Sequence, residues 1–239
     1  TVLEDTTQKS NFSDIEYNQN DLEKYLINVL RLEAVACKDW LTNKVDRSVT
    51  GKVATQQCAG PLQLPLNNLG IVALDYQGQS GISTAIGHAS ISALINPEAG
   101  SRLAIAESLT NLIWAPVTNK LQGVSLSANW MWPAKNNGEN ARLYQAVKAV
   151  SDFAIELGIN IPTGKDSLSM TQKYPDGDIV FSPGTVIISA VGEVTDIKKA
   201  ITPVIATIPG SKLIYLDLSD SAYELGGSSF AQSLNKVGS

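Results

Sequence analysis

Cysteine and histidine are scarce in this 239-residue chain, which has two cysteines and one histidine. Cys37 and Cys58 are too few for a disulfide framework or a cysteine-rich metal site, so we expect both to be reduced thiols. The single histidine, His88, is accompanied by no Gly-x-Ser-x-Gly nucleophile elbow. Hydrolase chemistry that depends on a histidine base is therefore not supported.

Excess positive charge and long apolar runs are also missing. The chain has 18 basic against 23 acidic residues, a net charge of −5, and no clustered basic face of the kind that binds nucleic acid. No apolar run reaches the roughly 18–20 residues that span a bilayer. Residues 1–5 lack the basic start and apolar core of a signal peptide. We expect a cytoplasmic protein with neither nucleic-acid nor membrane partners.

The chain does contain the alternating patterns of an α+β protein. β-Branched or alternating runs predict strands, and amphipathic runs predict helices. The predicted strands span residues 48–57, 71–74, 124–130 and 185–194, and the predicted helices span residues 21–36, 97–114 and 139–157. This order predicts a four-stranded sheet with the two long helices on one face. The other sheet face must then be buried elsewhere, most simply against another sheet.

The same patterns divide the chain into three parts. Residues 1–36 are predicted to be a linker and an N-terminal helix capped by Asp21, and residues 37–205 an α+β domain. Residues 206–239 are predicted to be the truncated start of a further domain. Within them, residues 212–218 have the composition of a buried strand, yet only about 20 residues follow. The first residue is Thr1, so we expect a piece of a longer protein.

Two groups of polar residues have side chains suited to phosphate or metal. Lys165 and Asp166 follow an apolar run and Gly164, but a Walker loop is excluded because Asp166 replaces its Ser or Thr and no glycine precedes Gly164 at the required spacing. Glu107 and Asn111 are four residues apart on a predicted helix, so they share a face. Magnesium prefers such oxygen ligands, although spacing alone favours two solvated surface side chains.

Six blocks of sequence, read in order, give these residues a context. The blocks are KVDRSVTG (44–51), QQCAGPLQ (56–63), ESLTN (107–111), SANWMWPAK (127–135), TGKDSLSM (163–170) and SPGTVIISA (182–190). Together they resemble the large phosphoribosylformylglycinamidine synthases, the amidotransferases of purine biosynthesis. The resemblance covers roughly residues 21–235 in one continuous order.

The resemblance implies that the chain is the second half of a synthetase region whose two halves are each similar to aminoimidazole ribonucleotide synthetase. Sheets from the two halves would face each other and close a barrel. The second half would retain a structural ATP or ADP with Mg²⁺, while turnover uses the first half. Partners would be the first synthetase half and the glutaminase domain, and the isolated chain would form a homodimer.

The resemblance also implies the overall chemistry. The parent enzyme would convert formylglycinamide ribonucleotide to formylglycinamidine ribonucleotide, using ATP and glutamine. This chain has neither a glutaminase segment nor a histidine-rich, proline-containing loop, so we expect it to be inactive alone. A purely structural pairing module with a decayed nucleotide pocket and an independent enzyme remain the alternatives.

Site residues follow from the same resemblance. Lys38 matches a nucleotide-contacting lysine, and Asn67 and Asn68 stand where the family has Ala and a magnesium-binding Asp. Asn68 keeps an oxygen ligand but removes one negative charge. The nucleotide contacts are expected to be Lys38, Asn67, Lys165 and Asp166, the last two by their chemistry. The metal ligands are expected to be Asn68, Glu107 and Asn111.

Overall fold

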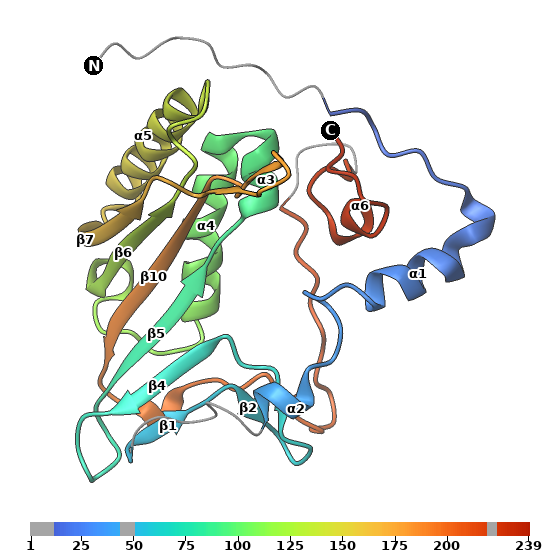
Figure 1. The fold of residues 1–239 in the computed structure, drawn as a ribbon. Helices are drawn as coiled ribbons and strands as arrows, with labels where there is room; N and C mark the ends of the chain where they lie inside the picture. Colours follow the sequence, from blue (N-terminus) through green and yellow to red (C-terminus); the bar gives the residue numbers. More distant parts are fainter. Residues whose placement is uncertain (1–11, 44–50, 219–223) are drawn as a thin grey trace.

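A six-stranded sheet forms the centre of the molecule (Figure 1). The structure is a computed structural model that describes residues 12–43, 51–218 and 224–239. The tail 1–11, the block 44–50 and the first part of the strand predicted at 48–57 lie outside the described residues. In sheet order the strands are β1 (Val53–Thr55), β4 (Leu69–Ala73), β5 (Gly81–Gly87), β10 (Thr185–Val194), β6 (Val124–Met131) and β7 (Asn160–Ser167). All neighbours are antiparallel except β6 and β7, which run parallel.

Two long helices cover one face of this sheet, and a short helix packs beside them (Figure 1). They are α4 (Pro97–Leu112), α5 (Glu139–Leu157) and the short α3 (Ser90–Ile95). The Asn96 side chain accepts hydrogen bonds from the N–H groups of Glu98 and Ala99 at the start of α4. Gly158 ends α5 with a φ of 69°. These are the cap conformations that Asn and Gly favour, and the predicted α+β class with helices on one face is confirmed.

The core lies between the sheet and these helices. It is built from apolar side chains of both layers, including Ile71, Leu126, Ile188, Val194, Ala104, Ile105, Leu112 and Val150. At one end of β6, Trp132 is fully buried, and its Nε1 donates a hydrogen bond of 2.9 Å to Glu139 Oε2 on α5. This contact joins the end of the strand to the first turn of the helix.

The opposite sheet face is open. Along β5, residues alternate between buried and exposed, as expected for a strand with one covered face. Four apolar side chains on the open face, Val72, Ile82, Ile86 and Val191, keep between 37% and 55% of their surface exposed. The predicted uncovered face is therefore confirmed, and the described residues close no barrel around it.

The predicted count of four strands was too low. The two strands that the sequence patterns missed are β5 and β7, which contain glycine or proline. Gly87 lies so close to α4 that an added Cβ would be 2.2 Å from the Ala104 carbonyl oxygen. Gly164 approaches the Ala128 carbonyl oxygen to the same distance. These glycines permit close backbone approach and do not interrupt their strands.

Two further expectations need correction. The predicted helix 21–36 ends earlier, because α1 spans Leu22–Leu30, and Asp21 makes no side-chain cap bond. Asn18 accepts the capping bond of the preceding turn instead. Residues 212–218 do not form a buried strand: Leu213, for example, is 88% exposed. Their apolar pattern suits burial, but within the described residues no neighbouring strand pairs with them.

The remaining elements lie around the central layers. Tyr17 and Tyr25 pack edge-on against Phe230, so the segments near the two ends of the described chain are in contact. No helix within the described ranges is long and apolar enough to cross a bilayer. These elements are η1 (Gln19–Asp21), α1, α2 (Asp39–Thr42), β2 (Cys58–Ala59), β3 (Leu64–Pro65), η2 (Lys120–Gly123), β8 (Thr171–Lys173), β9 (Ile179–Phe181), η3 (Ile197–Lys199) and α6 (Ser229–Ser233).

The turn between β4 and β5 is organised by one carboxylate. Asp75 accepts hydrogen bonds from the Ser80 hydroxyl at 2.6 Å and from the N–H groups of Ser80, Gln79 and Gly78. The Ser80 hydroxyl, followed by these N–H groups, holds the pKa of Asp75 well below its usual range, because each bond favours the ionised form.

Candidate functional site

Glu107 and Asn111 meet the end of β5 from the neighbouring helix α4. Glu107 Oε2 accepts a hydrogen bond of 2.6 Å from the backbone N–H of His88, and Asn111 Nδ2 donates one of 3.0 Å to the Ile86 carbonyl. The close approach at Gly87 makes both bonds possible, because a side chain there would push the helix away. Sequence spacing predicted that Glu107 and Asn111 share a face, and the structure confirms it.

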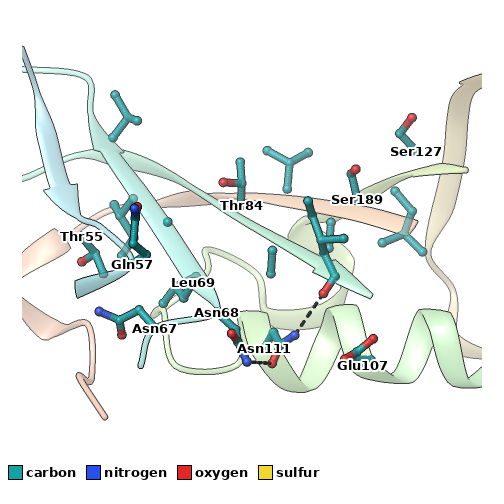
Figure 2. A pocket seen from close by; sticks show the side chains of 18 of the residues that line it. Thr55, Gln57, Asn67, Asn68, Leu69, Thr84, Glu107, Asn111, Ser127 and Ser189 are labelled. Carbon is teal, nitrogen blue, oxygen red and sulfur yellow. Dashed lines mark hydrogen bonds between the residues drawn. The ribbon is translucent and has the colours of Figure 1, made fainter. Parts of the chain in front are cut away.

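Asn68 joins this pair from the segment that leads into β4. Its Nδ2 donates a 3.4 Å hydrogen bond to Asn111 Oδ1 (Figure 2). The neighbouring Asn67 faces another direction: its Nδ2 donates to the Gln56 carbonyl at 2.7 Å, and its N–H donates to the Gln57 carbonyl at 3.0 Å. The structure thus brings the three expected metal ligands, Asn68, Glu107 and Asn111, to one place.

The chemistry of this trio is that of a weakly charged oxygen site. It offers one carboxylate and two amide oxygens, which are ligand types that magnesium accepts. Among the described residues, no group of three or more His, Cys, Asp or Glu side chains could hold a metal. The donor set of the trio fits Mg²⁺, provided that a ligand such as a phosphate supplies further oxygens and negative charge.

Two cavities meet at the trio. A cavity of about 810 Å³ extends over the open sheet face, and its lining includes Asn68, Glu107, Asn111 and His88. A second one, of about 330 Å³, is also lined by Asn68 and Asn111 and continues past Trp114 to residues 201–205. Both volumes are in the range of small-molecule sites.

The other expected site residues lie apart from the trio. The Lys38 ammonium donates to the carbonyl oxygens of Glu33 and Ala36, at 2.5 and 2.9 Å. Lys165 and Asp166 are on β7, which β10 and β6 separate from β5. At the usual strand spacing, this places them roughly 14 Å from β5. Neither Lys38, Lys165 nor Asp166 lines either cavity.

Sequence reasoning missed the groups that hold the trio in place. The partners of Glu107 and Asn111 are backbone atoms of His88 and Ile86, which carry no signal in residue type. Trp114 and residues 201–205 were also not assigned to a site. The exposure of Trp114, at 52%, is visible only in the structure.

Comparisons with known proteins agree with this picture. Residues 37–193 match the family model of the FGAR-AT PurM_N-like domain. A human phosphoribosylformylglycinamidine synthase is 45% identical over 214 residues, a probable one from Caenorhabditis elegans 45% over 219, and one from Dictyostelium discoideum 42% over 227. These matches cover 89%, 91% and 92% of this chain but only 16%, 16% and 17% of the relatives. The chain therefore spans about a sixth of their length.

Solved structures share the fold. The structure of PurLQS from Thermotoga maritima aligns with a TM-score of 0.54 at 16% identity, covering 85% of this chain and 29% of that one. T. maritima PurL complexed with ATP aligns with a TM-score of 0.50 at 14% identity, covering 84% of this chain and 28% of that one. At such identities the likeness concerns the fold alone.

Proposed function

This chain belongs to the family of FGAR-AT PurM_N-like domains, and from that membership we propose that it is one domain of a phosphoribosylformylglycinamidine synthase. The parent enzyme would use ATP and glutamine to convert formylglycinamide ribonucleotide to formylglycinamidine ribonucleotide. In it, this domain supplies an auxiliary nucleotide–magnesium site and a scaffold, and performs no chemical step alone. The observation that carries the proposal is the convergence of Asn68, Glu107 and Asn111 beside a large cavity.

Each residue of the trio has a distinct proposed role. Glu107 supplies the one negative charge, and its bond to the His88 N–H orients the carboxylate. Asn111 presents its Oδ1 while its Nδ2 is held by the Ile86 carbonyl. Mg²⁺, when bound, would neutralise the phosphates of the nucleotide. Lys38 and Asn67 are proposed as nucleotide contacts; Lys165 and Asp166 are left out because they lie three strands away.

A purely structural pairing module is the second candidate, and one contact favours it. Asn68 donates to the oxygen of Asn111 that a metal would need, so the apo trio satisfies itself. With Asn in place of a second carboxylate, the metal is also held by one charge fewer. In this case the pocket would be a remnant, and the open face would be the functional part.

Titration calorimetry of ADP in the presence of Mg²⁺ tests the nucleotide site. We expect saturable binding that is at least about tenfold weaker in Glu107→Gln, because the only charged ligand of the trio is lost. Glu156→Gln is the matched control, since Glu156 is an exposed carboxylate on α5. Absence of heat with the unmodified chain, or equal binding by both variants, would favour the structural module.

The open face is the proposed contact with the first synthetase half, while the glutaminase domain is a further partner within the parent chain. The exposed apolar side chains of Val72, Ile82, Ile86 and Val191 support this proposal. In isolation the chain would pair with a second copy through the same face. Analytical ultracentrifugation at high micromolar concentration should show a dimer, and a monodisperse monomer would contradict it. We also propose a cytoplasmic location.

A further inference from the structure

The open sheet face is divided chemically into two halves. β4, β5 and β10 contribute the exposed apolar residues described above, whereas the open face of β6 and β7 is polar. The polar half consists of Ser125, Ser127, Asn129, Thr163, Lys165 and Ser167. We propose that this polar half binds the phosphate group of a small phosphate monoester, at a site separate from the proposed nucleotide site.

Strand register places these side chains together. Ser127 is paired with Thr163 and Asn129 with Lys165 in the parallel ladder between β6 and β7. Ser127 and Thr163 line the 810 Å³ cavity over the open face, so residues two positions further along each strand point to the same side. Asn129 and Lys165 therefore extend the polar surface toward the end of β7.

Lys165 is prepared to receive an anion. Its ammonium donates a 2.6 Å hydrogen bond to Ser167 Oγ, and the side chain is exposed. Within the described residues Lys165 forms no ion pair, whereas Lys148 and Lys199 pair with Asp152 and Asp196. The Lys165 charge is thus held beside a hydroxyl and is not neutralised by a carboxylate.

Carboxylates are missing from this half of the face. β6 contains no acidic residue, and the only one in β7 is Asp166, which strand alternation directs to the other side. What remains is an ammonium with hydroxyl and amide groups, all of which can donate to oxygen. A phosphate offers several acceptor oxygens to such a set and pairs with lysine as a point charge.

Gly164 keeps the two strands close enough for these groups to act together. A Cβ on Gly164 would lie 2.2 Å from the Ala128 carbonyl oxygen, so any side chain would force β7 away from β6. The backbone between Thr163 and Lys165 is therefore fixed against β6, and the donors of both strands face one ligand.

The test is titration of the chain with inorganic phosphate, followed by ³¹P NMR line broadening in the presence of EDTA. We expect saturable binding that weakens about tenfold or more in Lys165→Gln, because a charged donor is lost. Lys173→Gln removes an exposed lysine from β8 and should bind like the unmodified chain. Asp166→Asn changes the charge on the opposite side and should also leave binding unchanged.

Three outcomes would overturn the proposal. They are no saturable broadening with the unmodified chain, equal weakening in Lys165→Gln and Lys173→Gln, and tighter binding in Asp166→Asn, which would indicate non-specific attraction. Glu107→Gln separates this site from the nucleotide site. Phosphate binding should persist in that variant even though metal-dependent ADP binding is lost, and loss of both together would contradict a separate site.

Discussion

Replacing Asn68 with aspartate should convert the weakly charged trio into a stronger magnesium site. In the structure Asn68 Nδ2 donates to Asn111 Oδ1, so a metal must displace this bond before it can reach both oxygens. Asn68→Asp removes the donor and adds a carboxylate facing Glu107 and Asn111. The substitution therefore acts on both obstacles at once.

The size of the effect follows from Coulomb's law. Two unit charges about 4 Å apart interact by about 4 kcal/mol at an effective dielectric constant of about 20. Asn68 and Glu107 are exposed, so solvent screens most of this energy. If about a third survives, roughly 1.4 kcal/mol, affinity for Mg²⁺ rises about tenfold.

Mg²⁺-dependent ADP calorimetry and Mn²⁺ binding followed by electron paramagnetic resonance both measure the change. In the absence of metal, Asn68→Asp should also lower the melting temperature, because two carboxylates then face each other; added Mg²⁺ should restore it. Asn119→Asp, on an exposed turn, is the control for added charge. If Asn68→Asp binds metal no more tightly than Asn119→Asp, the trio is not a metal site.

Two further predictions concern the scaffold around the site. Gly87→Ala should destabilise the chain by about 1–3 kcal/mol in urea unfolding, because its methyl group would overlap the Ala104 carbonyl; unchanged stability would mean that α4 can move freely. Asp75→Asn should lower the melting temperature at pH 7. Because hydrogen bonds depress the pKa of Asp75, its contribution is present above the unfolded pKa of about 3.9 and is lost as pH falls through the folded value. The gap between Asp75→Asn and the unmodified chain should therefore shrink below about pH 4, and a gap independent of pH would refute the assignment.

The elements that sequence located well are those determined by local chemistry. α5 spans Glu139–Leu157 as predicted, because its apolar periodicity and Gly158 act within the helix itself. The strand Thr185–Val194 was equally clear, since a β-branched run without stabilising helix signals has few alternatives. α4 begins at Pro97 as expected from the Asn96 cap.

What the sequence did not predict depends on contacts between distant segments. β5 and β7 contain glycines whose value lies in the backbone that approaches them, and that backbone belongs to other elements. Lys165 and Asp166 were grouped because they are adjacent in sequence, yet adjacent strand residues point to opposite faces. The family resemblance located the trio, but only the fold revealed that Asn68 and Asn111 bond to each other.

The attachment of Glu107 and Asn111 to main-chain atoms of β5 separates two kinds of evolutionary change. Their anchors are the N–H of His88 and the carbonyl of Ile86, which every non-proline residue would provide at those positions. Side chains on the outer surface of β5 can therefore be exchanged to suit a new neighbour while the two ligands keep their coordinates. A domain arranged in this way can change its partner without rebuilding its pocket.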